Sequence, residues 1–94
     1  VKKMSESINP QDAEVEEIIL GSCLIESKAI TLIADILRPE AFYNEKNLEI
    51  YATLQSMYRN GQKIDIITVK EELARRGKLE FIGGPYTLAH ISGV

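Results

Sequence analysis

The sequence is poor in the residue types that build disulfide-bonded or metal-stabilised folds. It has one cysteine, Cys23, one histidine, His90, and no tryptophan. A single cysteine excludes an internal disulfide bond, and one cysteine with one histidine is too few for a structural zinc site. No apolar run reaches the roughly 18 residues of a membrane span, and none follows the basic residues Lys2 and Lys3 as in a secretory signal. The single cysteine fits a reducing compartment, and we expect a cytoplasmic protein without a membrane segment.

The motifs of common catalytic sites are missing as well. The only Gly-Lys pair, Gly77-Lys78, is followed by Leu79, and Glu72 stands where a P-loop has its first glycine. The patterns H-x-x-E, C-x-x-C and G-x-S-x-G do not occur. A lone histidine is a weak general base, so His90 is interpreted as a surface or packing residue. The sequence therefore predicts no catalytic, cofactor-binding or metal-binding residue.

Positive charge is scarce relative to negative charge. The formal net charge is −3 over 94 residues, which is the length of one domain with a modest core. Residues 1–47 carry nine acidic side chains against five basic ones, and residues 48–94 carry five against six. Neither half has the strong basic field of a protein that binds duplex DNA.

Apolar residues recur at helical spacing along most of the chain, and no two segments form a plausible strand pair. The sequence predicts an all-α fold, a compact orthogonal bundle of about five short helices with no sheet. The helices are expected over about 13–26, 28–37, 45–59, 69–76 and 85–92. Residues 1–9 are expected to be a disordered arm, and residues 62–67 an extended linker whose isoleucines enter the core.

Residues suited to capping mark the expected helix ends. The predicted N-caps are Asp12, Ser27 and Asn44. Thr68 and Glu71 match the capping-box pattern at the start of the fourth helix. Pro85 suits the first position of the fifth helix because a proline there gives up no helical hydrogen bond.

The apolar spacing also predicts which side chains are buried. The apolar side of the first helix, expected to be buried, consists of Val15, Ile18, Ile19, Ser22/Cys23 and Ile25. Ala74 and Tyr86 are expected to face inward from the last two helices. Gly21, inside the first helix, is interpreted as a close crossing of two helices rather than a contact with a partner.

Two clusters of charged residues are expected on helix surfaces. The acidic cluster consists of Glu14, Glu16, Glu17 and Glu26. A solvated face near the positive end of the helix dipole explains it more simply than a cation site does. The basic cluster consists of Lys70, Arg75, Arg76 and Lys78. It is a candidate for weak contact with a nucleic acid or a partner, with little aromatic surface nearby to stack bases.

The order of the signals along the chain is more specific than any one of them. The first helix contains Pro10, the run Glu14-Val15-Glu16 and Gly21, and it is followed by the turn Pro39-Glu40-Ala41-Phe42-Tyr43. Later come Ile64-Asp65, Thr68, Gly77 and the pair Gly83-Gly84. This ordered set resembles the N-terminal domain of DnaB-like replicative helicases of bacteria. Asn47 and Cys23 depart from it, since the family usually has a histidine and an apolar residue there.

The resemblance implies a role in assembly. Proteins of this family are homohexameric, ATP-driven helicases of the replication fork, and their N-terminal domains form a collar on the ring. The implied partners are other copies of the chain, primase, a helicase loader and the single-stranded DNA that passes through the ring. ATP and Mg²⁺ belong to the ATPase domain, and the sequence ends before that domain and before the family's helical hairpin.

Three functional hypotheses follow from the sequence. The leading one is a non-catalytic protein interaction and assembly domain over residues 10–94. The alternatives are a stand-alone helical adaptor and a weak single-stranded-DNA-binding module. Primase binding separates the first from the adaptor, and a DNA titration at two salt concentrations tests the third.

Overall fold

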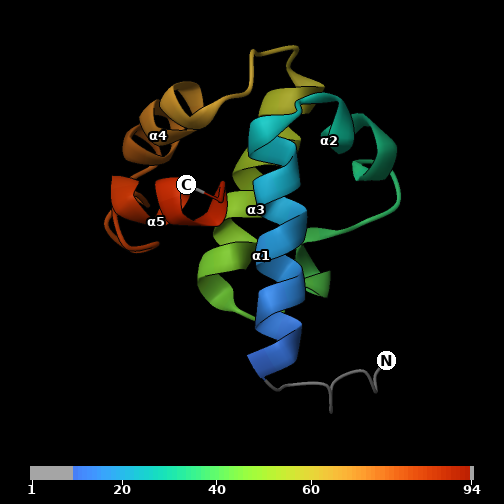
Figure 1. Cartoon of the computed structure of the whole chain (residues 1–94). Coiled ribbons are helices and arrows are strands. Elements are labelled where there is room, and N and C mark those ends of the chain that lie inside the picture. Colours follow the sequence, from blue (N-terminus) through green and yellow to red (C-terminus); the bar gives the residue numbers. More distant parts are fainter. Residues whose placement is uncertain (1–9, 94) are drawn as a thin grey trace.

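The structure is a computed structural model that describes residues 10–93, and it is built from short helices (Figure 1). In chain order the helices are α1 (Pro10–Ile25), α2 (Lys28–Ile33), the 3₁₀ helix η2 (Pro39–Ala41), α3 (Glu45–Arg59), α4 (Ile66–Arg75) and α5 (Pro85–Ile91). No strand occurs between residues 10 and 93. The predicted all-α fold is confirmed, whereas the predicted arm over residues 1–9 lies outside the described part of the chain.

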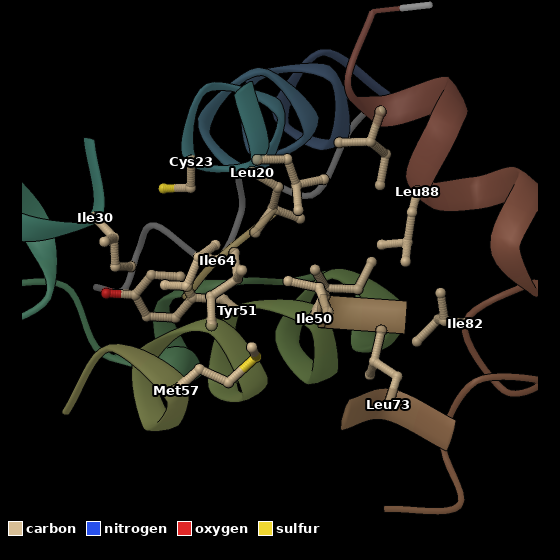
Figure 2. Close-up of a cluster of buried hydrophobic side chains, with 14 of the residues drawn as sticks. Leu20, Cys23, Ile30, Ile50, Tyr51, Met57, Ile64, Leu73, Ile82 and Leu88 are labelled. Atoms are coloured by element: carbon tan, nitrogen blue, oxygen red, sulfur yellow. The ribbon is translucent and has the colours of Figure 1, made fainter. Parts of the chain in front are cut away.

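The core is centred on α3, which packs against α1, α2, α4 and η2 (Figure 1). Its buried stripe consists of Ile50, Tyr51, Leu54 and Met57. Figure 2 shows Ile50, Tyr51 and Met57 of this stripe in one cluster with residues of the other helices, namely Leu20 and Cys23 from α1, Ile30 from α2, Leu73 from α4 and Leu88 from α5. Burying one such aliphatic side chain contributes about 1.5–3 kcal/mol. Because all the α-helices supply this one cluster, the domain has a single core.

Gly21 allows α1 and α5 to cross at close range. A Cβ atom placed on Gly21 would lie 2.2 Å from the backbone oxygen of Ile91. No real side chain tolerates that distance, so only glycine permits this approach. The prediction that Gly21 marks a helix crossing within the domain is confirmed.

Helix α2 ends at Ile33 and not at the predicted residue 37. In the segment after Ile33, backbone carbonyls accept hydrogen bonds from side chains of α3. The Tyr51 hydroxyl donates to the Leu37 oxygen at 2.7 Å, and the Gln55 amide donates to the Ala34 oxygen at 2.8 Å. The chain after Ile33 therefore continues as turns that are anchored to α3.

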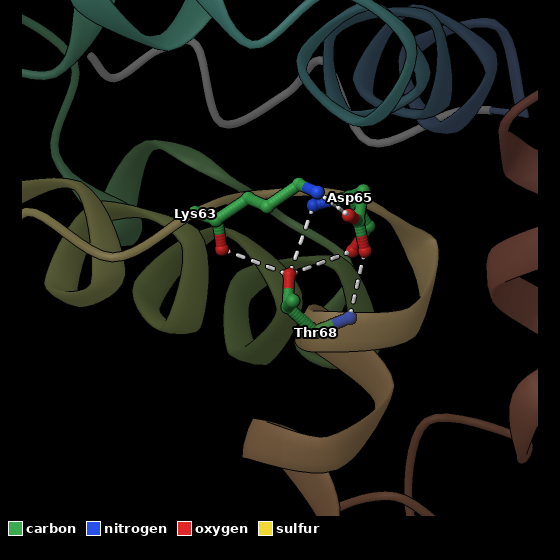
Figure 3. A network of polar contacts seen from close by, with 3 residues as sticks. All are labelled: Lys63, Asp65 and Thr68. Carbon is green, nitrogen blue, oxygen red and sulfur yellow. Dashed lines mark hydrogen bonds and ion pairs between the residues drawn. The ribbon is translucent and has the colours of Figure 1, made fainter.

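Helix α4 begins at Ile66, three residues before the predicted start at 69. Its N-cap is Asp65, whose carboxylate accepts from the Thr68 N–H at 2.8 Å, while Thr68 Oγ1 accepts from the Asp65 N–H at 2.9 Å (Figure 3). The capping box is therefore Asp65 with Thr68, and the predicted box of Thr68 with Glu71 is wrong. Because the helix starts early, Ile67 is 64% exposed instead of buried, whereas Ile64 does enter the core.

The other predicted caps have mixed outcomes. Asn44 is the N-cap of α3, as predicted, and its side chain accepts from the N–H groups of Lys46 and Asn47. Asp12 is not a cap because α1 already begins at Pro10. Ser27 precedes α2 in a helical conformation and makes no side-chain capping bond, so that prediction is also wrong. A residue that is already helical cannot turn its side chain back onto the next amides.

Two residues expected to face inward from the last helices are exposed. Tyr86 is 78% exposed, since the buried face of α5 is defined by Leu88 and Ile91. Two positions along a helix correspond to about 200° of rotation, which places Tyr86 opposite Leu88. Ala74 is exposed because its neighbour Leu73 points into the core.

Candidate protein interaction surface

Helices α1 and α2 carry large apolar side chains that the core does not cover. On α1, Val15 is 54% exposed, Ile18 67% and Ile25 68%. On α2 and the following turn, Leu32 is 77% exposed and Ile36 78%. The prediction that Val15, Ile18 and Ile25 face inward is wrong. Single exposed apolar residues are common, but several on one helix mark a candidate interaction surface.

The exposed residues of α1 share one face, which we call the α1 seam and define as Val15, Ile18, Ser22 and Ile25. They are spaced by three, four and three residues, the spacing of a coiled-coil contact face. The Ser22 hydroxyl donates to the Ile18 oxygen at 2.9 Å, so it needs no other partner. The opposite face of α1 supplies Leu20, Cys23 and Leu24 to the core. The helix is therefore apolar on both faces, and the domain uses one of them.

A shallow groove runs beside the α1 seam, between α1 and the end of α5. It is lined by Glu14, Glu17, Ile18, His90 and Ile91. Residues 10–25 contain acidic side chains but no lysine or arginine. The seam is thus bordered by negative charge on the side where α5 approaches α1 (Figure 1).

Glu16, predicted to be part of a solvated acidic face, points into the protein. It is only 8% exposed. Its carboxylate accepts from the backbone N–H of Tyr43 at 2.6 Å, from that of Asn44 at 3.3 Å, and from Asn47 Nδ2 at 3.0 Å. It therefore ties α1 to the start of α3. Of the predicted acidic cluster, Glu14 and Glu26 are exposed and Glu17 is half-buried, so only Glu16 departs from the prediction.

A second hollow surface carries exposed aromatic residues. Tyr43 and Phe81, which are 59% and 44% exposed, line one hollow together with Lys46. Beside it, the Tyr86 ring stacks on His90 with the ring centroids 6.2 Å apart. Sequence spacing does not predict this grouping, because the aromatic residues come from three separate segments.

Comparison with known proteins identifies the family of this fold. The family model described as "DnaB-like helicase N terminal domain" matches residues 8–94. The chain belongs to this family. The crystal structure of the N-terminal domain of DnaB helicase from Mycobacterium tuberculosis is similar, with a TM-score of 0.83 and 36% identity. The similarity covers 88% of this chain and 60% of that one.

Curated relatives of this DnaB-like domain are replicative helicases. The replicative DNA helicase DnaB of Rhodothermus marinus is 36% identical over 85 residues, which are 90% of this chain and 9% of that protein. The replicative DNA helicase DnaC of Bacillus subtilis is 32% identical over 89 residues, which are 95% of this chain and 20% of that protein. The chain thus spans at most about a fifth of the length of these relatives, and it matches the part that the family model describes as N-terminal.

Several family-motif residues of the DnaB-like domain shape its turns. Pro39 begins η2, and Phe42 is buried against the Tyr51 ring at a centroid distance of 4.9 Å. Gly77 ends the α4 region with φ +73, a left-handed conformation that favours glycine. The Gly83-Gly84 pair forms the turn before α5.

The remaining motif residues divide between contacts inside the domain and its surface. Pro10 begins α1, Gly21 lies at the crossing with α5, and Asp65 and Thr68 cap α4. Glu14 and Tyr43 are exposed. These two side chains are available to a partner.

The basic cluster lies on α4 and the segment after it, next to acidic partners. Arg75 and Arg76 both pair with Glu72, Arg76 through its Nε atom at 3.1 Å. Lys78 Nζ lies 3.8 Å from Glu49 and 5.5 Å from the centre of the Phe81 ring. Lys70 is half-buried on α4. The paired carboxylates weaken the positive field that the sequence suggested, although Lys78 does lie beside an aromatic ring.

The described part of the DnaB-like domain shows no candidate metal site, and its cysteine is buried. Between residues 10 and 93, no group of three or more His, Cys, Asp or Glu side chains is placed to hold a metal ion. Burial raises the pKa of the Cys23 thiol to about 11, so the thiol stays protonated near neutral pH. Within the same range, no helix is both long and apolar enough to cross a membrane.

Proposed function

We propose that this domain is a non-catalytic protein interaction and assembly module of a replicative DNA helicase. The proposal rests above all on the exposed apolar side chains of α1, Val15, Ile18 and Ile25, which the core does not cover. Family membership supplies the context, because the relatives are named as replicative DNA helicases. A helical domain that leaves such side chains uncovered is suited to binding another protein.

The proposed setting is the collar of a homohexameric helicase ring in the cytoplasm. In that setting the domain contacts neighbouring copies, and primase and a helicase loader bind the collar. Single-stranded DNA passes through the ring without depending on the basic cluster. ATP and Mg²⁺ act in the ATPase domain of such a helicase, and we assign no cofactor to residues 10–93.

The first test is the size of the native polypeptide. An immunoblot of the source cells, with an antibody raised against this domain, should show a band several times larger than the 10.5 kDa of this chain. A band near 10.5 kDa would instead favour the stand-alone adaptor.

The second test is an isothermal calorimetric titration of the domain with primase from the same source. Saturable binding supports the assembly role. If primase does not bind and the native polypeptide is short, the proposed function is wrong.

A further inference from the structure

We propose that the α1 seam is the docking site for one amphipathic helix of a partner protein, with lysine or arginine beside its apolar residues. The inference rests on the proposed function and goes further by giving the chemistry and secondary structure of the partner segment. It also selects one of the exposed surfaces, because the α1 seam combines apolar spacing, a groove and charge of one sign.

The spacing of the α1 seam suits a helix better than an extended peptide. Residues spaced by three, four and three lie along one line of a helix, which a second helix can follow with its own apolar residues. Val15, Ile18 and Ile25 are more than half exposed and offer three anchors along α1. Ser22 between them is small and bonded to its own helix, so a partner side chain can pack over it without leaving a polar group unsatisfied.

The border of the α1 seam sets the charge of the partner. Glu14 and Glu17 line the groove toward α5, and Glu26 is exposed just beyond the end of α1. Besides these carboxylates, the groove is lined by the imidazole of His90. A docked helix would place its flanking residues over these carboxylates, where lysine and arginine attract and acidic residues repel.

A second copy of the chain fits this surface less well. Its α1 would bring the same acidic side chains against Glu14 and Glu17, and residues 10–25 offer no lysine or arginine to balance them. Like charges along a helix pair destabilise that pairing. The complementary occupant is therefore a basic amphipathic helix.

Two synthetic peptides of about 20 residues test the proposal with the whole 94-residue chain. Both carry leucine at the contact positions, and the flanking positions are lysine in one peptide and glutamate in the other. Fluorescence anisotropy of labelled peptide measures binding. We expect the affinity of the lysine peptide to be at least about tenfold higher than that of the glutamate peptide. The affinity of the lysine peptide should fall as NaCl is added.

Matched variants place the binding on the α1 seam. Ile18→Ser with Ile25→Ser should weaken binding of the lysine peptide about tenfold or more. Leu32→Ser with Ile36→Ser removes apolar residues of α2 and the following turn that are somewhat more exposed, and it should leave binding unchanged. Thermal unfolding checks that both variants remain folded. Glu14→Gln with Glu17→Gln should reduce the preference for the lysine peptide.

Three results would overturn the proposal. The first is that the lysine peptide still binds the variant Ile18→Ser with Ile25→Ser as tightly as the wild type, which would mean that charge alone holds the peptide. Another is a dimer in sedimentation that those changes abolish, which would make a second copy the occupant. The third is absence of peptide binding, and it leaves the proposed function standing if the native polypeptide is large and primase binds.

Discussion

Glu16 joins two distant parts of the chain through one carboxylate that accepts from Tyr43, Asn44 and Asn47. Glu16→Ala would leave these donors without an acceptor at a site that is only 8% exposed. Unsatisfied buried donors are costly, so we expect the free energy of unfolding to fall by about 2–3 kcal/mol. Urea denaturation measures the change.

The control is Glu14→Ala on the exposed side of α1, whose free energy of unfolding should stay within about 0.5 kcal/mol of the wild-type value. Equal losses in the two variants would refute the role given to Glu16.

Asp65 makes part of the stability depend on pH. The Thr68 N–H lowers the pKa of the Asp65 carboxyl, and the charge of Lys63 adds to this. The folded pKa lies below the unfolded value of about 3.9, so the stabilisation is present above that value and is lost as the pH falls through the folded pKa. Asp65→Asn keeps an acceptor oxygen but has no charge. Between about pH 5 and pH 2 the variant should lose less stability than the wild type. Parallel profiles of urea midpoint against pH would contradict this.

Thr68 tests the same cap without changing its charge. Thr68→Ala removes the hydroxyl that accepts from the Asp65 N–H at 2.9 Å and donates to the Lys63 oxygen at 2.8 Å. Loss of a cap interaction costs about 1 kcal/mol. We expect that loss of stability in urea unfolding at neutral pH. Most of the pH dependence should remain, because the Thr68 N–H, which lowers the Asp65 pKa most, is kept, whereas the smaller contribution of the Thr68 hydroxyl is lost. Glu71→Ala is the control, because Glu71 belongs to the wrongly predicted capping box. A larger loss of stability in Glu71→Ala than in Thr68→Ala would show that Thr68 and Glu71 do form a capping box.

At the scale of elements, the α1–α5 crossing depends on Gly21. Gly21→Ala gains about 1 kcal/mol of helix propensity. Its new Cβ would meet the Ile91 backbone oxygen at 2.2 Å, so α5 would have to move. Overpacking of this kind costs about 1–3 kcal/mol or more, and we expect a net loss of stability in thermal unfolding. Ser22→Ala, at the next and exposed position, should change little. If Gly21→Ala were more stable than the wild type, α5 would be able to move away from α1 at little energetic cost.

Helix α3 was predicted with its observed bounds because its signals are local. Asn44 caps it, its apolar stripe is continuous, and Asn60-Gly61 ends it. The end of α2 could not be predicted in this way, since the bonds from Tyr51 and Gln55 come from residues more than ten positions away. The start of α4 was misplaced because Asp65 and Thr68 both fit a cap, and sequence alone does not choose between them.

The candidate site was missed for a related reason. Helix α1 has apolar residues on both faces, and helical spacing does not say which face meets the core. One signal was available in the sequence. Ile18 and Leu20 are two positions apart and point in nearly opposite directions, so both cannot face α3. The inward turn of Glu16, which fixes the choice, depends on the distant Tyr43, Asn44 and Asn47.

At the scale of the whole molecule, the charge distribution argues against DNA binding by this domain. The chain carries a net charge of −3, and the basic cluster has Glu72 and Glu49 beside it. Binding to phosphates requires unbalanced cations and weakens steeply as salt is added. The exposed rings of Tyr43 and Phe81 supply some stacking surface, but stacking adds to an electrostatic attraction that is weak here.

We therefore expect no saturable binding of a labelled oligothymidylate at micromolar protein in about 50 mM or 200 mM NaCl, measured by fluorescence anisotropy. Lys70→Gln with Lys78→Gln should leave the signal unchanged, and Phe81→Ala should do the same. Binding at low salt that vanishes at high salt and in the lysine variant would contradict this expectation and favour the single-stranded-DNA-binding alternative. Binding that Phe81→Ala alone abolished would point instead to the aromatic hollow, since Lys78 lies 5.5 Å from the centre of that ring.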